Sequence, residues 1–155
     1  MKYIKEAHKD TGCFFCAYLR QKRDSETFIL HRGEHCFSIL NRYPYNTGHL
    51  MIAPRAHKAS LADLNADEIL DLWGQARQMQ AILDRALHPR GYNLGINLGR
   101  VAGAGVLGHL HLHVVPRWNG DTNFMPVVGG TKVMPLALGD LYRQLRKALR
   151  EMRPE

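Results

Sequence analysis

Three histidines at alternate positions carry the clearest chemical signal in this sequence. His109, His111 and His113 lie in the run G-H-L-H-L-H-V-V-P, whose intervening residues are apolar and partly β-branched, as is typical of a β-strand. Alternate residues of a strand point to one face, so the three imidazoles are expected to line up roughly 7 Å apart. Imidazole titrates near neutral pH and can act as a nucleophile, base, acid or metal ligand. The chemistry of the protein is therefore expected on this strand.

Two kinds of chemistry fit such a row. In the first, all three histidines bind one zinc ion whose fourth position stays open, as in a zinc hydrolase. In the second, a neutral imidazole attacks phosphorus, and water or phosphate then resolves the phosphoramidate intermediate. The glycine-rich loop 99–108 directly precedes the histidines, and backbone N–H groups of such a loop can hold phosphate oxygens. This context favours the nucleophilic chemistry.

The strands that position the histidines are short and mostly joined by hairpins. Runs rich in β-branched and aromatic residues predict strands at 27–32, 35–40, 49–53 and 92–98. The first two form a hairpin at Gly33–Glu34, and Pro54 stops the third. With the helices segregated from these strands, the pattern predicts an α+β fold with an antiparallel sheet.

The helices are predicted at three places. Residues 56–64 can hold a short helical turn, and an amphipathic helix covers about 136–150. One long helix is expected over 66–87, with Asn65 as its N-cap and Glu68 at the capping-box position. Its apolar stripe is predicted to face the core and comprises Ile69, Leu72, Trp73, Ala76, Met79, Leu83, Ala86 and Leu87.

The bulk properties predict one cytoplasmic domain with anionic partners. A chain of 155 residues is long enough for one core, and it has neither a membrane-spanning apolar run nor an apolar N-terminal signal segment. The net charge of +7 favours nucleotides or polyphosphates as partners. Nucleic acid is not the expected partner, because no recognition motif accompanies the charge. A solvated face explains the basic residues of the last helix: Arg143, Arg146, Lys147, Arg150 and Arg153.

The cysteines separate into a pair and a single residue. Cys13 and Cys16 form a C-F-F-C motif, which fits half of a tetrahedral zinc site and also fits two reduced, buried thiols. Cys36 lies in the apolar run C-F-S-I-L and is predicted to be a core residue.

These motifs together resemble a known family. The run H-L-H-L-H-V-V resembles the motif of the histidine triad (HIT) family of nucleotide hydrolases and transferases. Residues 37–54, F-S-I-L-N-R-Y-P-Y-N-T-G-H-L-M-I-A-P, are similar to that family's ribose-binding strand, loop and following strand. The segments R-W-N-G-D-T-N-F and G-G-T-K-V-M-P resemble the branch with the bacterial diadenosine tetraphosphate phosphorylases. The resemblance covers roughly 13–140 and implies a HIT-like fold.

The resemblance implies roles for five residues. His111 matches the nucleophile, and His113 matches the histidine that contacts the phosphate and the leaving group. His49 matches a supporting histidine on the neighbouring strand. Asn41 matches a ribose contact and Asn97 a residue near the transferred phosphate, although turn formation is the alternative explanation of both asparagines.

The chain departs from the family pattern just before the triad. Many members carry Gln and then Ser or Thr there, where this sequence has Gly105 and Val106. Side-chain contacts to the leaving group are lost at these two nucleotide-binding positions, and backbone N–H groups are the expected substitutes.

The resemblance also implies a zinc ligand set. Zinc-containing members use a C-x-x-C pair, a histidine that follows in P-x-x-H and the first triad histidine, here Cys13, Cys16, His57 and His109; His31 and His35 are rival ligands. A site with four protein ligands is closed to substrate, so we expect a structural zinc. Such a zinc ion would hold the N-terminal segment, residues about 10–20, against the strand that carries the three histidines.

The resemblance implies an enzyme made of a single HIT domain over 1–155, with a catalytic core over about 27–130. The expected reaction cleaves dinucleoside polyphosphates such as diadenosine tetraphosphate through a nucleotidyl-His111 intermediate, with phosphate rather than water as the favoured acceptor. Arg117 and Lys132 are candidate phosphate contacts, or else solvated surface residues. Hydrolysis of nucleoside phosphoramidates or other adenylate conjugates is the first alternative, and a nucleotide-binding module with little turnover is the second. Family members usually form homodimers, so a homodimer is expected.

Overall fold

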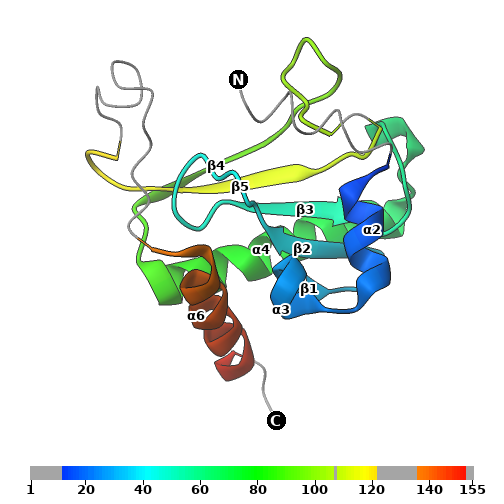
Figure 1. Cartoon of the computed structure of the whole chain (residues 1–155). Helices are drawn as coiled ribbons and strands as arrows, with labels where there is room; N and C mark the ends of the chain where they lie inside the picture. The colour runs from blue at the N-terminus through cyan, green and yellow to red at the C-terminus, as the bar shows by residue number, and fades with distance from the viewer. Residues whose placement is uncertain (1–11, 107, 122–135, 153–155) are drawn as a thin grey trace.

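A five-stranded antiparallel sheet forms the centre of the molecule in a computed structural model, which describes residues 12–106, 108–121 and 136–152 (Figure 1). The spatial order of the strands is β1-β2-β3-β5-β4. Their bounds are β1 Ile29–Arg32, β2 Cys36–Leu40, β3 Leu50–Pro54, β4 Gly91–Ile96 and β5 Leu112–Arg117. The predicted α+β class with an antiparallel sheet is confirmed.

The first hairpin is shorter than predicted at its N-terminal end. Residues Asp24–Thr27 form the short helix α3 instead of the start of a strand, and Phe28 follows with a left-handed φ of 62°. Because an extended strand needs negative φ, β1 begins only at Ile29. The turn at Gly33–Glu34 and the pairing of β1 with β2 agree with the prediction.

Strand β5 is also shorter than predicted, and only His113 of the three histidines lies within its bounds. Leu112 is the first residue of β5 and pairs with Ile52 of β3. Pro54, two residues after Ile52 in β3, has no N–H to donate. The hydrogen bonds between β3 and β5 therefore cannot continue toward His111 and His109. The chain there is held instead by the N–H of Leu110, which donates to the carbonyl of Lys58 at 2.7 Å.

Two helices cover one face of the sheet. The helix α4, Ala66–Leu87, has the predicted bounds and the predicted capping box of Asn65 and Glu68, and α6, Leu138–Glu151, packs beside it. The core between these helices and the sheet contains, among others, Leu30, Cys36, Leu40, Leu50, Ile52, Leu72, Met79, Leu83, Leu112, Val114 and Leu145. Cys36 lies in this core and is fully buried, so the prediction that it is a core residue is confirmed.

The predicted apolar stripe of α4 is correct in its centre and wrong at its margin. Ile69 is 40% exposed and Trp73 is 53% exposed, whereas Ile82, which the stripe omitted, is buried. A helix buries only the arc that contacts its neighbours, and these two side chains lie at the edge of that arc.

The other face of the sheet carries a helix that the sequence pattern did not predict. Helix α2, Phe14–Gln21, packs there through Phe15 against a second apolar cluster that includes Phe37, Ile39 and Met51. Met51 pairs with His113 across β3 and β5, and paired residues share a face. The histidines therefore point to the side of the sheet that α2 covers.

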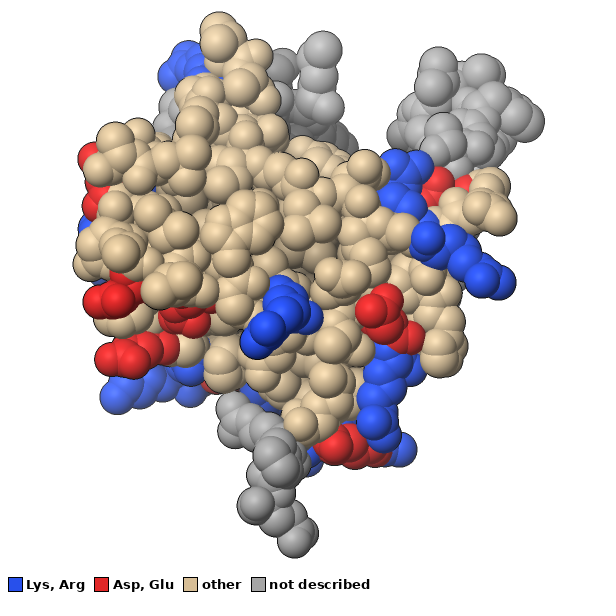
Figure 2. Space-filling view, turned by 180° about the vertical axis from the view of Figure 1, so that it is seen from behind, with Lys and Arg blue, Asp and Glu red and all other residues tan. Residues whose placement is uncertain are grey.

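The remaining described elements are few. The predicted helical turn is the 3-10 helix η1, Leu61–Asp63. No helix in the described ranges is long and apolar enough to cross a membrane. Lys132, Arg153 and the segment G-G-T-K-V-M-P, residues 129–135, lie outside the described residues. Viewed from behind, acidic side chains are interspersed with basic ones and uncharged surface lies between them (Figure 2), so positive charge is not concentrated on this face.

Candidate active site and metal cluster

The imidazole of His111 is held with its Nε2 lone pair available. Its Nδ1 lies 2.9 Å from the carbonyl oxygen of His109, which can only accept, so Nδ1 carries the proton. The neutral ring then has its lone pair on Nε2. His111 is buried, and its ring makes no other hydrogen bond among the described residues, so the Nε2 lone pair is available to act as a nucleophile.

A chain of hydrogen bonds fixes the tautomer of His113. The backbone N–H of Tyr45 donates to His49 Nδ1 at 2.9 Å, so the proton of His49 is on Nε2. His49 Nε2 lies 2.9 Å from His113 Nδ1 and donates to it. The proton of His113 is consequently on its Nε2, a buried atom without a hydrogen-bond partner among the described residues. A donor directed into the site and left unpaired is suited to a phosphate or leaving-group oxygen.

Burial keeps these rings neutral. It lowers the pKa of His109 and His111, and it lowers the pKa of His113 to about 4, with the neighbouring His111 as a smaller cause. The rings of His111 and His113 lie 4.8 Å apart in an edge-to-face arrangement. At neutral pH both are therefore uncharged, which a nucleophile requires.

Asn41 supports His49 and forms a turn. Its Oδ1 accepts from the N–H of Tyr43 at 2.9 Å, and its Nδ2 donates to His49 Nδ1 at 3.3 Å. The first contact is the Asx-type turn that was the alternative explanation of this residue. Its contact with a ribose stays a prediction.

The glycine-rich loop lies beside the triad. Asn97 and Val106 line a cavity of about 140 Å³ that His109 also borders. Val106 packs against the apolar cluster of Phe15 and Met51, and its side chain offers no hydrogen-bond donor. The predicted nucleotide contacts of Asn97, Gly105 and Val106 stay predictions.

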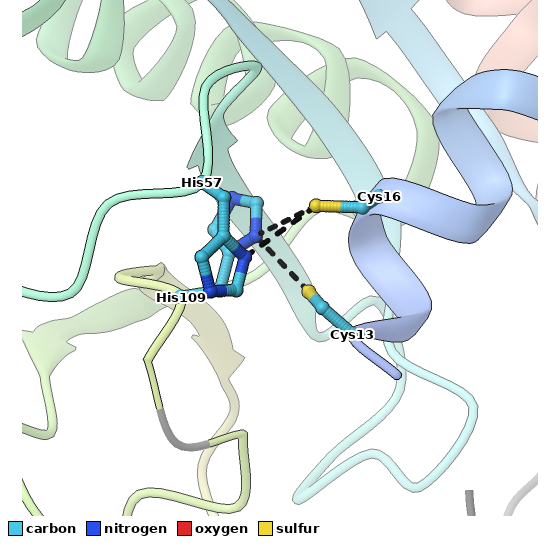
Figure 3. Close-up of side chains that lie close together, drawn as sticks. All are labelled: Cys13, Cys16, His57 and His109. Atoms are coloured by element: carbon cyan, nitrogen blue, oxygen red, sulfur yellow. Dashed lines mark hydrogen bonds between the residues drawn. The ribbon is translucent and has the colours of Figure 1, made fainter. Parts of the chain in front are cut away.

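Four side chains from three separate parts of the chain converge into what we call the Cys–His cluster: Cys13, Cys16, His57 and His109 (Figure 3). Their ligand atoms all lie within 4.8 Å of one another. His109 Nδ1 is 3.1 Å from Cys13 Sγ and 3.7 Å from Cys16 Sγ, and His57 Nδ1 is 3.5 Å from Cys16 Sγ. A tetrahedral zinc site with ordinary bond lengths needs ligand atoms about 3.3–3.8 Å apart. The three distances above lie close to this range, and the two thiols and two imidazoles are a donor set that zinc prefers.

The tautomer of His109 fits the same ion. Its Nε2 lies 2.8 Å from the carbonyl oxygen of Pro54 and must donate to it, so the Nδ1 lone pair is directed at the two thiols. A hydrogen bond on the second ring nitrogen is the usual way in which proteins orient a histidine ligand. Pro54 thus ends the ladder of β3 and orients this ring.

The loop that carries His57 is fixed on both sides. Lys58 Nζ lies 2.6 Å from Glu68 Oε2 on α4, and this ion pair is the main reason that the pKa of Glu68 is lowered. On the other side, Gly108 has a φ of 83°, and a Cβ there would lie 3.4 Å from His57 Nε2. The left-handed backbone favours glycine at this position, and the loop of His57 lies in van der Waals contact with it.

The other candidates lie elsewhere. His31 and His35, the rival ligands, are outside the Cys–His cluster. The guanidinium of Arg117 forms a two-point ion pair with Asp121, at 2.8 Å from Nε and 2.7 Å from Nη2, so its charge is already compensated there.

Sequence reasoning missed three contributors to the site. They are Phe15, whose ring contacts both Phe37 and His111, Tyr45, whose N–H orients His49, and the ion pair of Lys58 with Glu68. Only Phe15 had a signal in the sequence, its place within C-F-F-C.

Comparison with known families identifies the domain. The HIT domain family profile matches residues 22–120. The AP-4-A phosphorylase of Mycobacterium tuberculosis is 42% identical over 125 residues, which are 81% of this chain. The match spans only 64% of that relative's length.

Solved structures agree with the fold. A Zn-bound histidine triad family protein from Mycobacterium smegmatis superposes with a TM-score of 0.74 at 27% identity, covering 91% of this chain and 95% of that one. A histidine triad nucleotide-binding protein from Sulfolobus tokodaii gives a TM-score of 0.70 at 27% identity, covering 90% of each chain.

Proposed function

The chain belongs to the HIT domain family, and on this basis we propose that it is an enzyme that cleaves dinucleoside polyphosphates through a nucleotidyl-histidine intermediate. The observation that carries the proposal is the pair of assigned tautomers. His111 presents a lone pair on Nε2, and His113, two residues further along the chain, presents a proton on its Nε2. One group can attack phosphorus while the other stabilises the oxygen that departs.

The reaction has two steps. His111 Nε2 attacks the α-phosphorus, an N–P bond forms, and the P–O bond to the remaining polyphosphate breaks. As positive charge develops on the imidazole, the Nδ1–H bond to the carbonyl of His109 becomes stronger and stabilises it. The His113 Nε2–H donates a hydrogen bond to the departing oxygen. In the second step an oxygen of the acceptor attacks the same phosphorus, and the N–P bond breaks.

We favour inorganic phosphate as the acceptor, because of the likeness to an AP-4-A phosphorylase. With diadenosine tetraphosphate, the first step releases ATP and leaves AMP on His111. Transfer to phosphate then yields ADP, whereas transfer to water yields AMP.

The test is product identification with and without phosphate. We expect ADP plus ATP only when phosphate is present. AMP plus ATP in buffer alone would mean hydrolysis, and tight binding without turnover would mean a nucleotide-binding module. His111→Ala should abolish turnover and keep the fold. A variant that retained the rate would remove His111 as the nucleophile.

We also propose that the Cys–His cluster holds zinc, supported by the ligand geometry and by the Zn-bound relative. With four protein ligands the ion has no open position, so its role is structural.

Two further proposals concern the whole protein. The first is a homodimer, which is supported by apolar side chains exposed on the edge strand β4 (Leu94) and on α4 (Leu70 and Trp73). Sedimentation of the purified protein measures the oligomeric state. The cytoplasmic location stays a prediction, which a reporter fusion checks.

A further inference from the structure

We propose that Phe15 is a positioning residue that holds the His111 imidazole in its attacking orientation, an inference that rests on the proposed function. Phe15 lies in α2, far from the triad in sequence, and is fully buried. The ring of Phe15 lies 5.3 Å from the ring of His111 and 5.1 Å from that of His109. This ring contact joins α2 to the proposed nucleophile.

His111 needs such a contact because its hydrogen bond alone leaves freedom. The torsion that turns an imidazole has broad minima, and a hydrogen bond tolerates a wide range of angles. In-line attack is less tolerant, since a displacement of about 1 Å can lower a rate about 100-fold. The rings of Phe15 and His113, at 5.3 Å and 4.8 Å, contact the imidazole of His111 and limit its rotation.

The position of Phe15 is in turn tied to the Cys–His cluster. Phe15 lies between Cys13 and Cys16 in the chain, and both thiols approach His109. His109 is two residues from His111 and accepts its Nδ1–H on the backbone carbonyl. A metal held by these four ligands therefore fixes both the helix that presents Phe15 and the segment that presents His111.

A residue in the same apolar cluster provides a matched control. Phe37 of β2 is also fully buried, and its ring lies 5.8 Å from that of Phe15. Phe37 has no ring contact with a histidine among the described residues. Replacing either phenylalanine by leucine removes similar volume from the same cluster, so the two variants separate packing from orientation.

The experiment compares Phe15→Leu with Phe37→Leu, both loaded with zinc and checked for metal content and unfolding. For Phe15→Leu we expect kcat with diadenosine tetraphosphate to fall about 10- to 100-fold and KM to stay within about 2-fold. For Phe37→Leu we expect kcat to stay within about 3-fold at a similar loss of stability. If Phe15→Leu does not fold, Phe15→Met takes its place, because the unbranched methionine side chain lacks a ring but adapts to irregular core space.

A second measurement does not depend on turnover. In nitrogen-edited NMR spectra without substrate, the Nδ1–H proton of His111 should exchange with water faster in Phe15→Leu than in wild type, and at an unchanged rate in Phe37→Leu. Equal losses of kcat in both variants, or unchanged kcat and unchanged exchange in Phe15→Leu, would overturn the proposal. If wild type turns over no substrate, the proposed function fails, and the exchange rates still report whether Phe15 holds the ring.

Discussion

Two backbone groups, a carbonyl that can only accept a hydrogen bond and an N–H that can only donate one, determine which nitrogens of the candidate histidines are protonated. The carbonyl of His109 must accept, which places a proton on His111 Nδ1. The N–H of Tyr45 must donate, which places the proton of His49 on Nε2 and that of His113 on Nε2. Backbone geometry thus places the protons of two chemically identical side chains differently, which suits His111 to the proposed role of nucleophile and His113 to that of hydrogen-bond donor.

His49→Leu should lower kcat by about 100-fold or more, which is the usual contribution of a positioned proton donor. The variant removes the donor to His113 Nδ1, so the proton of His113 is no longer confined to Nε2. His49→Gln keeps an N–H near the position of the lost Nε2 and should retain more activity than His49→Leu. Steady-state kinetics check the order. Equal activity of wild type and His49→Leu would contradict the assigned tautomers.

The pH profile should reflect the low pKa of His113. Burial lowers this pKa to about 4, so the ring stays neutral as the pH falls past the ordinary histidine range. Protonation would add a proton on Nδ1, which opposes the N–H of His49. We therefore expect kcat to change little between pH 8 and pH 5.5, roughly, and to fall as the pH approaches 4. Unfolding measured at each pH controls for loss of the fold. A decline centred on an ordinary histidine pKa would contradict this assignment.

The sequence singled out the candidate histidines but not the groups that orient them. Strand periodicity placed the three histidines on one face, and their nearness to a glycine-rich loop favoured phosphorus chemistry. The partners of these histidines are backbone groups of Tyr45, Pro54 and His109, and a backbone carbonyl has no signature in the sequence. Phe15 lies 96 residues from His111, so only folding brings the two rings together.

At the scale of the elements, the sequence predicted helix α4, whose ends are determined by neighbouring residues, but not helix α2, which depends on tertiary packing. Helix α4 has the predicted bounds because both halves of its capping box, Asn65 and Glu68, are in the sequence next to its start. Helix α2 has only eight residues, and its N-cap Cys13 makes no side-chain capping bond. A helix this short depends on tertiary packing, here of Phe15 on the sheet, which the sequence pattern does not reveal.

One carboxylate joins α4 to the first hairpin. Asp71 Oδ2 accepts from the N–H groups of His35 and Cys36 at 2.8 and 2.7 Å, at the start of β2. Burial disfavours the charge of this carboxylate, but these two bonds and one from Gln75 outweigh it and lower the pKa of Asp71.

Asp71→Asn should therefore destabilise the fold by about 1.5–3 kcal/mol, since charge-assisted bonds are lost and an amide N–H faces a backbone N–H. Because the folded pKa is lowered, the contribution of Asp71 is full at neutral pH and disappears as the pH falls through the acidic range. Urea unfolding at pH 7 and pH 3 checks both statements. Asp67→Asn, on the exposed first turn of the same helix, is the control and should change stability by about 0.5 kcal/mol.

At the scale of the whole molecule, the Cys–His cluster connects segments that no hairpin joins. It links the start of α2, the loop before α4 and the chain leading into β5. A metal there would tie the start of α2 to the loop of His57 and to the segment of His109, so zinc should contribute to the stability of the entire fold.

Removing zinc with a chelator should lower the melting temperature by about 10 °C, because an ion present at about 1,000 times its dissociation constant contributes about 4 kcal/mol. His57→Ala should lower both the zinc content and the melting temperature. His35→Ala, which removes a half-buried histidine outside the cluster, should change neither. Cobalt in place of zinc should preserve kcat within a few-fold, since a closed site contributes no ligand position to the reaction. An apo protein with an unchanged melting temperature that regains activity only with metal would make the zinc catalytic and refute its structural role.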